Sequence, residues 1–205
     1  MFKIIPKKNN AAAEINCDLN KINLKQLNQI KLALNNYGMI YFRKQNLSSA
    51  NYLKFAKKFG KLADYPRLKG LSSKYSKITV VQRKKTDKGP SFGEQFHTDS
   101  IYTKKPPKFT MLLSKIVPKK GIANTEFSSQ YLAYQNLPLK IKKKIQNLKA
   151  KYSSEGPISV TRLEREREKG KKNNEFGHPP CCVNNCVALM YIWSISGCSS
   201  RSILM

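Results

Sequence analysis

The clearest pattern in the chain is a run of apolar residues at three- and four-residue spacing. The run consists of Leu24, Leu27, Ile30, Leu34 and Tyr37. This spacing gives a helix one apolar face. Asn23 suits the N-cap position because its side-chain oxygen can accept a hydrogen bond from a first-turn N–H. Gly38 follows, where glycine commonly ends a helix in a left-handed conformation. The pattern therefore predicts a helix over residues 24–37.

Shorter apolar segments predict further elements in the first half of the chain. Met39–Phe42 is typical of a short buried strand. A second helix is predicted to begin near Ser48 or Ser49 and to end at Gly60. Its expected buried residues are Tyr52, Phe55, Ala56 and Phe59. The β-rich runs at 78–81 and 109–117 predict two more strands.

Helical spacing returns after residue 127. One helix is expected at about residues 128–137, and Pro138 suits the first position of the next. The residues expected to face inward there are Leu137, Ile141, Ile145 and Leu148, with five lysines outward. Arg162–Lys172 is highly charged and indicates an exposed helix or a mobile loop. The combination predicts a mostly β fold with surface helices, a β-sandwich or jelly roll.

The charge of the chain raises the question of whether it binds nucleic acid. The chain has 39 Lys and Arg against 12 Asp and Glu, a formal net charge of +27. The lysines are spread from Lys3 to Lys172 and do not gather in one tail or stripe. We therefore interpret them as a solvated basic surface, with nucleic-acid binding as the less favoured alternative.

The sequence also bears on location. No apolar run reaches the roughly 18 residues of a membrane span, and the N-terminus has no apolar signal region. Five cysteines, an odd number, argue against a disulfide framework. We expect a cytoplasmic protein that does not act at a membrane. A homo-oligomer stays open.

The candidate chemistry lies at His97-Thr98-Asp99. In an extended strand the side chains alternate, so His97 and Asp99 would point to the same side. Two such ligands can take neighbouring positions on one metal ion. A second histidine would complete the facial triad of non-haem Fe(II) oxygenases. Taken alone the tripeptide is a weak signal, because a loop histidine bonded to an aspartate fits it equally well.

The surrounding motifs strengthen this signal. Upstream lie Tyr-Phe-Arg-Lys-Gln at 41–45 and Phe-Ala-x-x-Phe-Gly at 55–60. Downstream come Pro-Pro at 106–107, Val-Pro at 117–118, the segment 121–127, and Ala-Tyr-Gln-Asn-Leu-Pro at 133–138. This order, over about residues 10 to 180, resembles the taurine dioxygenase family, which includes 2,4-dichlorophenoxyacetate dioxygenase.

The resemblance implies a fold, a reaction and site residues. The implied fold is a double-stranded β-helix (jelly roll), incomplete at the C-terminus. The implied reaction is Fe(II)- and 2-oxoglutarate-dependent hydroxylation of a small, anionic organic substrate by dioxygen. His97 and Asp99 match two iron ligands of the family. Thr125 matches a threonine that contacts a carboxylate of 2-oxoglutarate, and we expect it on a strand near that pair.

Several positions depart from the family pattern. Phe96 replaces a tryptophan, and Ile122-Ala123-Asn124 replaces the Gly-Asp that precedes the threonine. Tyr65-Pro66 stands where taurine dioxygenase has a His-Pro pair that contacts the sulfonate. Taurine is therefore disfavoured as the substrate.

The second metal-binding histidine and the 2-oxoglutarate-binding arginine of the family lie further downstream. The chain has only two histidines, His97 and His178. His178 begins a His-Pro segment that matches a structural position, so we do not assign it as a ligand. We expect an incomplete active site and a 205-residue chain that is inactive or nearly so.

The C-terminal segment has a different composition. No lysine follows Lys172, and residues 173–205 contain four of the five cysteines and Trp193, the only tryptophan. We interpret residues 1–180 as a partial dioxygenase domain and 181–205 as an anomalous Cys- and Ser-rich tail from a frameshift or chimeric end. A real C-terminal strand followed by a natural tail is the alternative. The DNA sequence around codon 179 would distinguish them.

Two other functions compete with the dioxygenase. One is a catalytically dead basic binding protein that retains the fold. The other is a zinc site, whose candidate ligands are His178, Cys181, Cys182 and Cys186. Their spacing fits no standard zinc finger, which makes the zinc site the weaker of the two.

Overall fold

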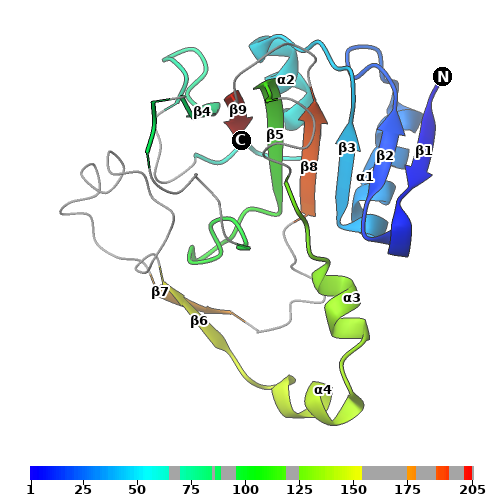
Figure 1. Cartoon of the computed structure of the whole chain (residues 1–205), viewed down its shortest axis with the longest axis vertical. Helices are drawn as coiled ribbons and strands as arrows, with labels where there is room; N and C mark the ends of the chain where they lie inside the picture. Colours follow the sequence, from blue (N-terminus) through cyan, green and yellow to red (C-terminus); the bar gives the residue numbers. More distant parts are fainter. Residues whose placement is uncertain are drawn as a thin grey trace. The chain divides into compact units, whose positions relative to one another are not determined.

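The chain forms two compact units, each built from separate stretches of sequence. The computed structural model describes residues 1–64, 70–84, 86–88, 96–118, 125–153, 175–178, 188–193 and 201–204 (Figure 1). Unit 1 comprises Met1–Lys88, Phe109–Glu126 and Ala188–Met205, and unit 2 comprises Gly89–Lys108 and Phe127–Val187. The predicted domain boundary at residue 180 is a different division, and it stays a prediction.

Unit 1 is built on a seven-stranded sheet in the order β1-β2-β3-β8-β5-β9-β4. Its strands are β1 (Lys3–Pro6), β2 (Ala13–Asn16), β3 (Met39–Phe42), β4 (Thr79–Gln82), β5 (Phe109–Ile116), β8 (Ala188–Trp193) and β9 (Arg201–Leu204). A short 3-10 helix, η1 (Lys8–Asn10), joins β1 to β2. The strands predicted near residues 39–42, 78–81 and 109–117 are confirmed as β3, β4 and β5. Strands β1 and β2 were not predicted.

The centre of the sheet contains a strand from the far end of the sequence. Strand β8 lies between β3 and β5 and runs parallel to both, with Tyr191 opposite Tyr41 on one side and Leu112 on the other. Strand β9 pairs antiparallel with both β5 and β4. Both strands fall within residues 181–205, which we interpreted from the sequence as an anomalous tail, with a real C-terminal strand as the alternative.

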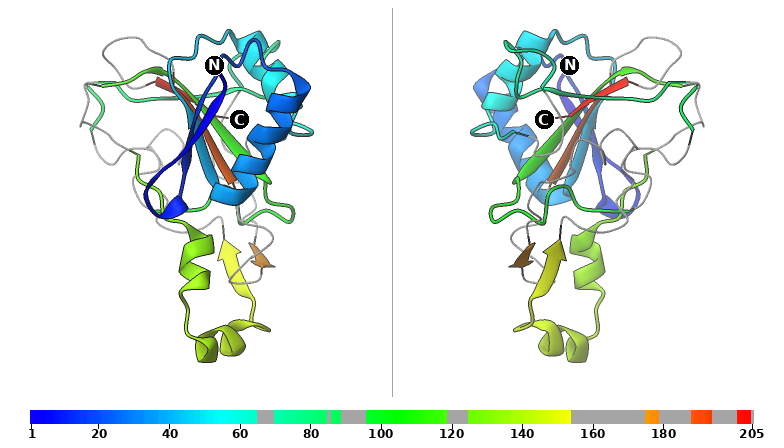
Figure 2. Two further views of the ribbon diagram at one scale, coloured as in Figure 1. Left: turned by 90° about the vertical axis from the view of Figure 1, so that its right-hand side faces the viewer. Right: turned by 90° about the vertical axis from the view of Figure 1, so that its left-hand side faces the viewer.

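Helix α1 (Leu24–Tyr37) confirms the first prediction, including both ends. The Asn23 side chain accepts from the backbone N–H of Gln26, and the Gln26 side chain accepts from the backbone N–H of Asn23. Gly38 ends the helix with φ 68°. The helix lies along one face of the sheet (Figure 2). Leu27, Ile30 and Leu34 are buried as expected, but Leu24 is 72% exposed and does not join the core.

Helix α2 (Ser49–Lys57) supplies the aromatic part of the core. Ser48 is its N-cap, as expected within one residue. The Phe55 ring makes edge-to-face contacts with Phe42 and Phe59. Tyr52 is fully buried, and its hydroxyl donates to the carbonyl oxygen of Met111 on β5 at 2.7 Å. These contacts fix α2 against strands β3 and β5.

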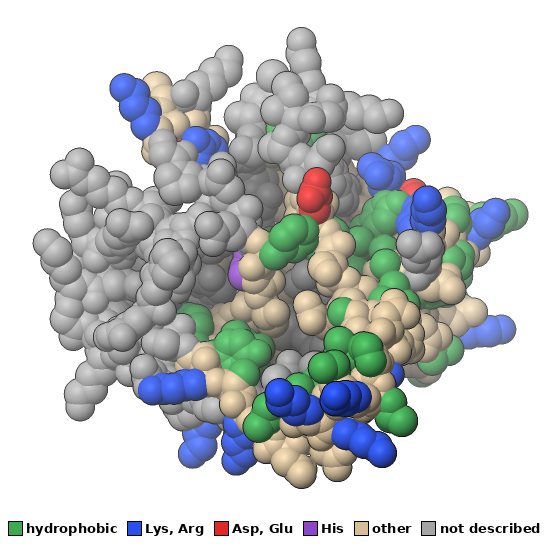
Figure 3. Space-filling model, turned by 60° about the horizontal axis from the view of Figure 1, so that its bottom comes forward, with side chains coloured by type: hydrophobic (Ala, Val, Ile, Leu, Met, Phe, Trp, Pro, Cys, Tyr) green, Lys and Arg blue, Asp and Glu red, His purple; other side chains and the backbone are tan. Residues whose placement is uncertain are grey.

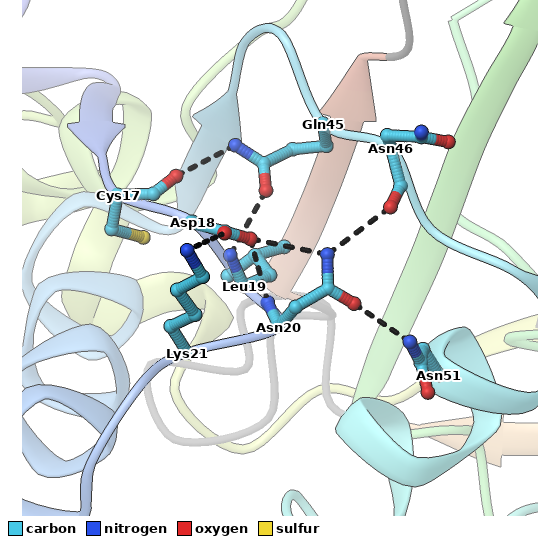
Figure 4. Close-up of polar contacts among 8 residues, drawn as sticks. All are labelled: Cys17, Asp18, Leu19, Asn20, Lys21, Gln45, Asn46 and Asn51. Atoms are coloured by element: carbon cyan, nitrogen blue, oxygen red, sulfur yellow. Dashed lines mark hydrogen bonds and ion pairs between the residues drawn. The ribbon is translucent and has the colours of Figure 1, made fainter.

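The Gln45 side chain connects the loop before α1 to the loop after β3. Its Oε1 accepts from the backbone N–H of Leu19, and its Nε2 donates to the carbonyl oxygens of Cys17 and Arg43. Next to it, Asn20 is bonded to the side chains of Asp18 and Asn51 and to the Asn46 carbonyl oxygen (Figure 4). Gln45 is buried, and both the oxygen and the nitrogen of its amide are hydrogen-bonded. We therefore assign this network a structural role, in which it holds the two loops together.

Glu14 anchors the outer strands of the sheet. Its carboxylate accepts from Lys7 Nζ at 2.8 Å and from the Tyr41 hydroxyl at 3.0 Å, and Arg43 Nε lies 3.7 Å away. The hydrogen bond from Lys7 lowers the pKa of Glu14 below its ordinary value of 4.5, although burial opposes this. The bonds of Glu14 to Lys7 and Tyr41 therefore connect β2 both to β3 and to the segment that follows β1.

We expect Glu14→Gln to make the free energy of unfolding less dependent on pH in the acidic range. A carboxyl whose folded-state pKa is lowered stabilises the fold above its unfolded-state pKa, and this contribution is lost as the pH falls through the folded value. In urea unfolding, the wild-type midpoint should fall more steeply below pH 4.5 than that of Glu14→Gln. Glu126→Gln, at an exposed position, is the matched control. Equal slopes for wild type and Glu14→Gln would contradict the assigned role.

The described residues of unit 2 form two helices and a small sheet. Its elements are α3 (Gln130–Gln135), α4 (Leu139–Ile145), β6 (Ala150–Ser153) and β7 (Glu175–His178). Strands β6 and β7 pair antiparallel, with Ala150 opposite His178. The helices are where the sequence predicts them, but α4 buries no residue. Ile141 and Leu148 are exposed, so the expected inward face is wrong for them. Lysines and apolar side chains lie together on the surface that Figure 3 brings forward.

The described residues confirm the fold class in broad terms, as strands combined with helices. The charged segment Arg162–Lys172 lies outside the described residues. Within the part of the chain that the structure describes, no helix is long and apolar enough to cross a membrane.

Candidate active site

His97 and Asp99 lie side by side in unit 2. The distance between His97 Nε2 and Asp99 Oδ1 is 3.2 Å. The expected strand is wrong: residues 96–98 have no regular structure, and Asp99 begins a turn that continues to Tyr102. The two side chains are nevertheless close, as expected from the sequence.

The pair is asymmetric in its exposure. The His97 side chain is 50% exposed, whereas that of Asp99 is 13% exposed. Phe96, directly before the histidine, is 72% exposed. The carboxylate is therefore largely shielded from solvent, while the imidazole is half exposed.

The separation of the two atoms suits a shared metal ion. Two ligands with bonds of about 2.1 Å at a right angle lie roughly 3 Å apart. A neutral imidazole and a hard carboxylate are also the ligand types of the two-histidine, one-carboxylate site of Fe(II). Among the described residues no group of three or more His, Cys, Asp or Glu side chains could hold a metal. The described part of the chain thus brings together two side chains of the residue types expected at such a site.

The turn beyond Asp99 has no counterpart among the elements predicted from the sequence. Ser100 has a positive φ of 50° and is buried. Its carbonyl oxygen accepts from the backbone N–H of Thr103 at 3.0 Å and from the Thr103 hydroxyl at 2.8 Å. No composition signal marks this turn, because it contains no glycine, proline or asparagine at the left-handed position.

Thr125 differs from expectation in its local structure. It lies after β5 in a segment that is not a strand, and it is exposed. Its predicted contact with 2-oxoglutarate stays a prediction. Tyr65-Pro66, the segment Ile122-Ala123-Asn124, and Cys181, Cys182 and Cys186 of the alternative zinc site lie outside the described residues. His178 is placed at the end of β7.

Comparison with known proteins decides the family. The family described as "Taurine catabolism dioxygenase TauD, TfdA family" matches residues 3–197. The chain belongs to this TauD/TfdA family. The resemblance inferred from the motif order is thereby confirmed. Enzymes of the TauD/TfdA family are dioxygenases that depend on Fe(II) and 2-oxoglutarate.

Named relatives agree with this assignment. An alpha-ketoglutarate-dependent 2,4-dichlorophenoxyacetate dioxygenase from Cupriavidus pinatubonensis is 26% identical over 141 residues, which are 62% of this chain and 49% of the relative. Pentalenolactone F synthase from Streptomyces avermitilis is 24% identical over 135 residues, 62% of this chain and 44% of that protein. The chain thus spans about half the length of these TauD/TfdA relatives.

Solved structures of similar proteins share the fold. A taurine dioxygenase from Burkholderia xenovorans superposes with a TM-score of 0.65 at 18% identity, covering 91% of this chain and 62% of the other. AAD-2, in complex with Mn(II) and N-oxalylglycine, superposes with a TM-score of 0.63 at 21% identity, covering 91% and 69%. At these identities the likeness concerns the fold alone.

Proposed function

We propose that this chain carries part of the active site of an Fe(II)- and 2-oxoglutarate-dependent dioxygenase. The observation that carries the proposal is the 3.2 Å approach of His97 Nε2 to Asp99 Oδ1 within a TauD/TfdA family match over residues 3–197. The site is incomplete within these 205 residues, because a second metal-binding histidine and the family's arginine have no assigned counterpart. The complete fold would be the jelly roll.

Each proposed residue has a distinct task. His97 would donate a lone pair to the iron through Nε2, so its remaining proton would sit on Nδ1. Asp99 would supply the negative charge that favours a divalent cation, and its shielded position limits competition from water. Thr125 would donate its hydroxyl proton to a carboxylate of 2-oxoglutarate. The bound iron would supply the activation of dioxygen for hydroxylation.

The substrate class follows from charge and from the departures noted in the sequence. A small anionic organic molecule suits a protein of net charge +27, and Tyr65-Pro66 argues against taurine. We place the protein in the cytoplasm, acting on a diffusible substrate together with dioxygen.

Anaerobic calorimetric titration of the chain with Fe(II), with and without 2-oxoglutarate, tests the proposal. We expect 2-oxoglutarate to raise the Fe(II) affinity, because the co-substrate itself chelates the metal. Thr125→Val should reduce this enhancement by about tenfold, the cost of one hydrogen bond to a charged group. It should leave Fe(II) binding without 2-oxoglutarate unchanged.

Thr86→Val, at an exposed threonine elsewhere in the chain, is the matched control. It should retain the full enhancement by 2-oxoglutarate. An Fe(II) affinity that does not respond to 2-oxoglutarate in the wild type would overturn the proposed function. A normal enhancement in Thr125→Val would remove Thr125 from the site and leave the metal ligands standing.

A further inference from the structure

The turn after Asp99 has a backbone conformation that needs support. Ser100 adopts φ 50°, a left-handed conformation that is unfavourable for a residue with a Cβ atom. Ser100 is also buried, at 8% exposure, so its backbone polar groups have little access to water. Such a conformation persists only where neighbouring contacts determine it. The contacts that do so are therefore candidates for a role at the adjacent Asp99.

Thr103 provides these contacts. Its backbone N–H and its hydroxyl both donate to the carbonyl oxygen of Ser100, at 3.0 Å and 2.8 Å. Two donors from one residue thus converge on a single acceptor. That acceptor belongs to the residue directly after Asp99, so it restrains the backbone from which the carboxylate extends. Thr103 lies four residues beyond Asp99 and closes the turn.

We propose that Thr103 is a positioning residue for the metal site. Its hydroxyl holds the Ser100 turn, and the turn keeps the Asp99 carboxylate beside His97. The inference rests on the proposed function, because it takes His97 and Asp99 as metal ligands. A metal site requires its ligands within about 0.5 Å of the productive geometry. A single backbone restraint next to a ligand can therefore decide whether that ligand is in place.

The test uses Mn(II), whose unpaired electrons broaden the NMR signals of nearby imidazole protons. The chain has only two histidines, so His178→Gln assigns the two sets of signals. Thr103→Val removes the hydroxyl while keeping the shape of the side chain and the backbone donor. We expect it to weaken Mn(II) binding, measured from broadening of the His97 signals, by roughly 3- to 10-fold. Thr103→Ser restores the hydroxyl and should recover wild-type affinity.

Thr86→Val is the matched control, because Thr86 is an exposed threonine outside the candidate site. It should bind Mn(II) like the wild type. Thr103→Ala provides a second hydroxyl-free variant if the valine disturbs folding, which amide signal dispersion would reveal.

Two results separate this inference from the proposed function. Wild-type affinity in Thr103→Val and Thr103→Ala, with loss of binding in Asp99→Asn, would overturn the role of Thr103 and leave the metal site intact. Equal broadening of His97 in the wild type and in Asp99→Asn would overturn the metal site itself, and this inference with it. Failure of Thr103→Ser to recover affinity would show that the hydroxyl is not the cause.

Discussion

Replacing Asp99 by asparagine is expected to weaken Fe(II) binding by more than roughly 100-fold, because loss of an outer-shell partner alone costs 10- to 100-fold. The substitution preserves the shape of the side chain and removes its charge. A neutral amide oxygen is a poor replacement for a carboxylate on a divalent cation. Of the two proposed ligands, only His97 would then remain. Anaerobic equilibrium dialysis against Fe(II), with iron counted per chain, measures the loss.

The control for this prediction is Asp64→Asn, the same substitution at an exposed aspartate that pairs with Lys77. Its iron content should equal that of the wild type. An Asp99→Asn protein that retains its iron would show that the contact between His97 and Asp99 is an ordinary hydrogen bond. The dioxygenase assignment of this site would then be wrong.

Phe55→Ala is expected to have the largest effect on stability, lowering the free energy of unfolding by about 3–5 kcal/mol. Phe55 is 2% exposed and stands between Phe42 and Phe59, with ring centroids 6.2 Å and 5.2 Å away. Its removal would leave a cavity and break both aromatic contacts. Since domains are commonly stable by about 5–15 kcal/mol, this loss is a large fraction of the total.

Urea unfolding followed by circular dichroism measures the change, with the slope checked for two-state behaviour. Phe96→Ala is the matched control, because the same substitution at a 72% exposed ring should alter the free energy of unfolding by about 0.5 kcal/mol or less. Equal destabilisation by the two substitutions would contradict the core described for unit 1.

Sequence patterns predicted those elements whose signals are local. Helix α1 was predicted to the residue because its capping groups and apolar spacing lie within the helix itself. Strand β5 was similarly clear from its length. Strands β1 and β2 were missed because, unlike the apolar or β-rich runs of β3 and β4, their four residues mix polar with apolar side chains, and their pairing is what defines them. The same limit applies to the order of strands, which depends on contacts between residues far apart in sequence.

The candidate site shows the same division. The motif order identified His97 and Asp99, because their residue types carry the chemistry. The turn that follows Asp99 was not predicted, since the left-handed Ser100 is not one of the residue types that mark such a position in a sequence. The exposed face of α4 was mispredicted for a related reason. Helical periodicity gives an apolar face but does not specify what covers it.

The position of β8 has a consequence for how this protein is made. The ribosome adds residues in order, so strands β1 to β5 of unit 1 emerge well before the strand that joins β3 to β5. Until residues 188–204 arrive, one edge of β3 and both β4 and β5 lack their partner strands, and such unpaired edges are prone to pair with other chains. Unit 1 should therefore complete its sheet only after residues 188–204 have been synthesised, and its nascent chain should depend on chaperones for longer than a protein whose strands pair in sequence order.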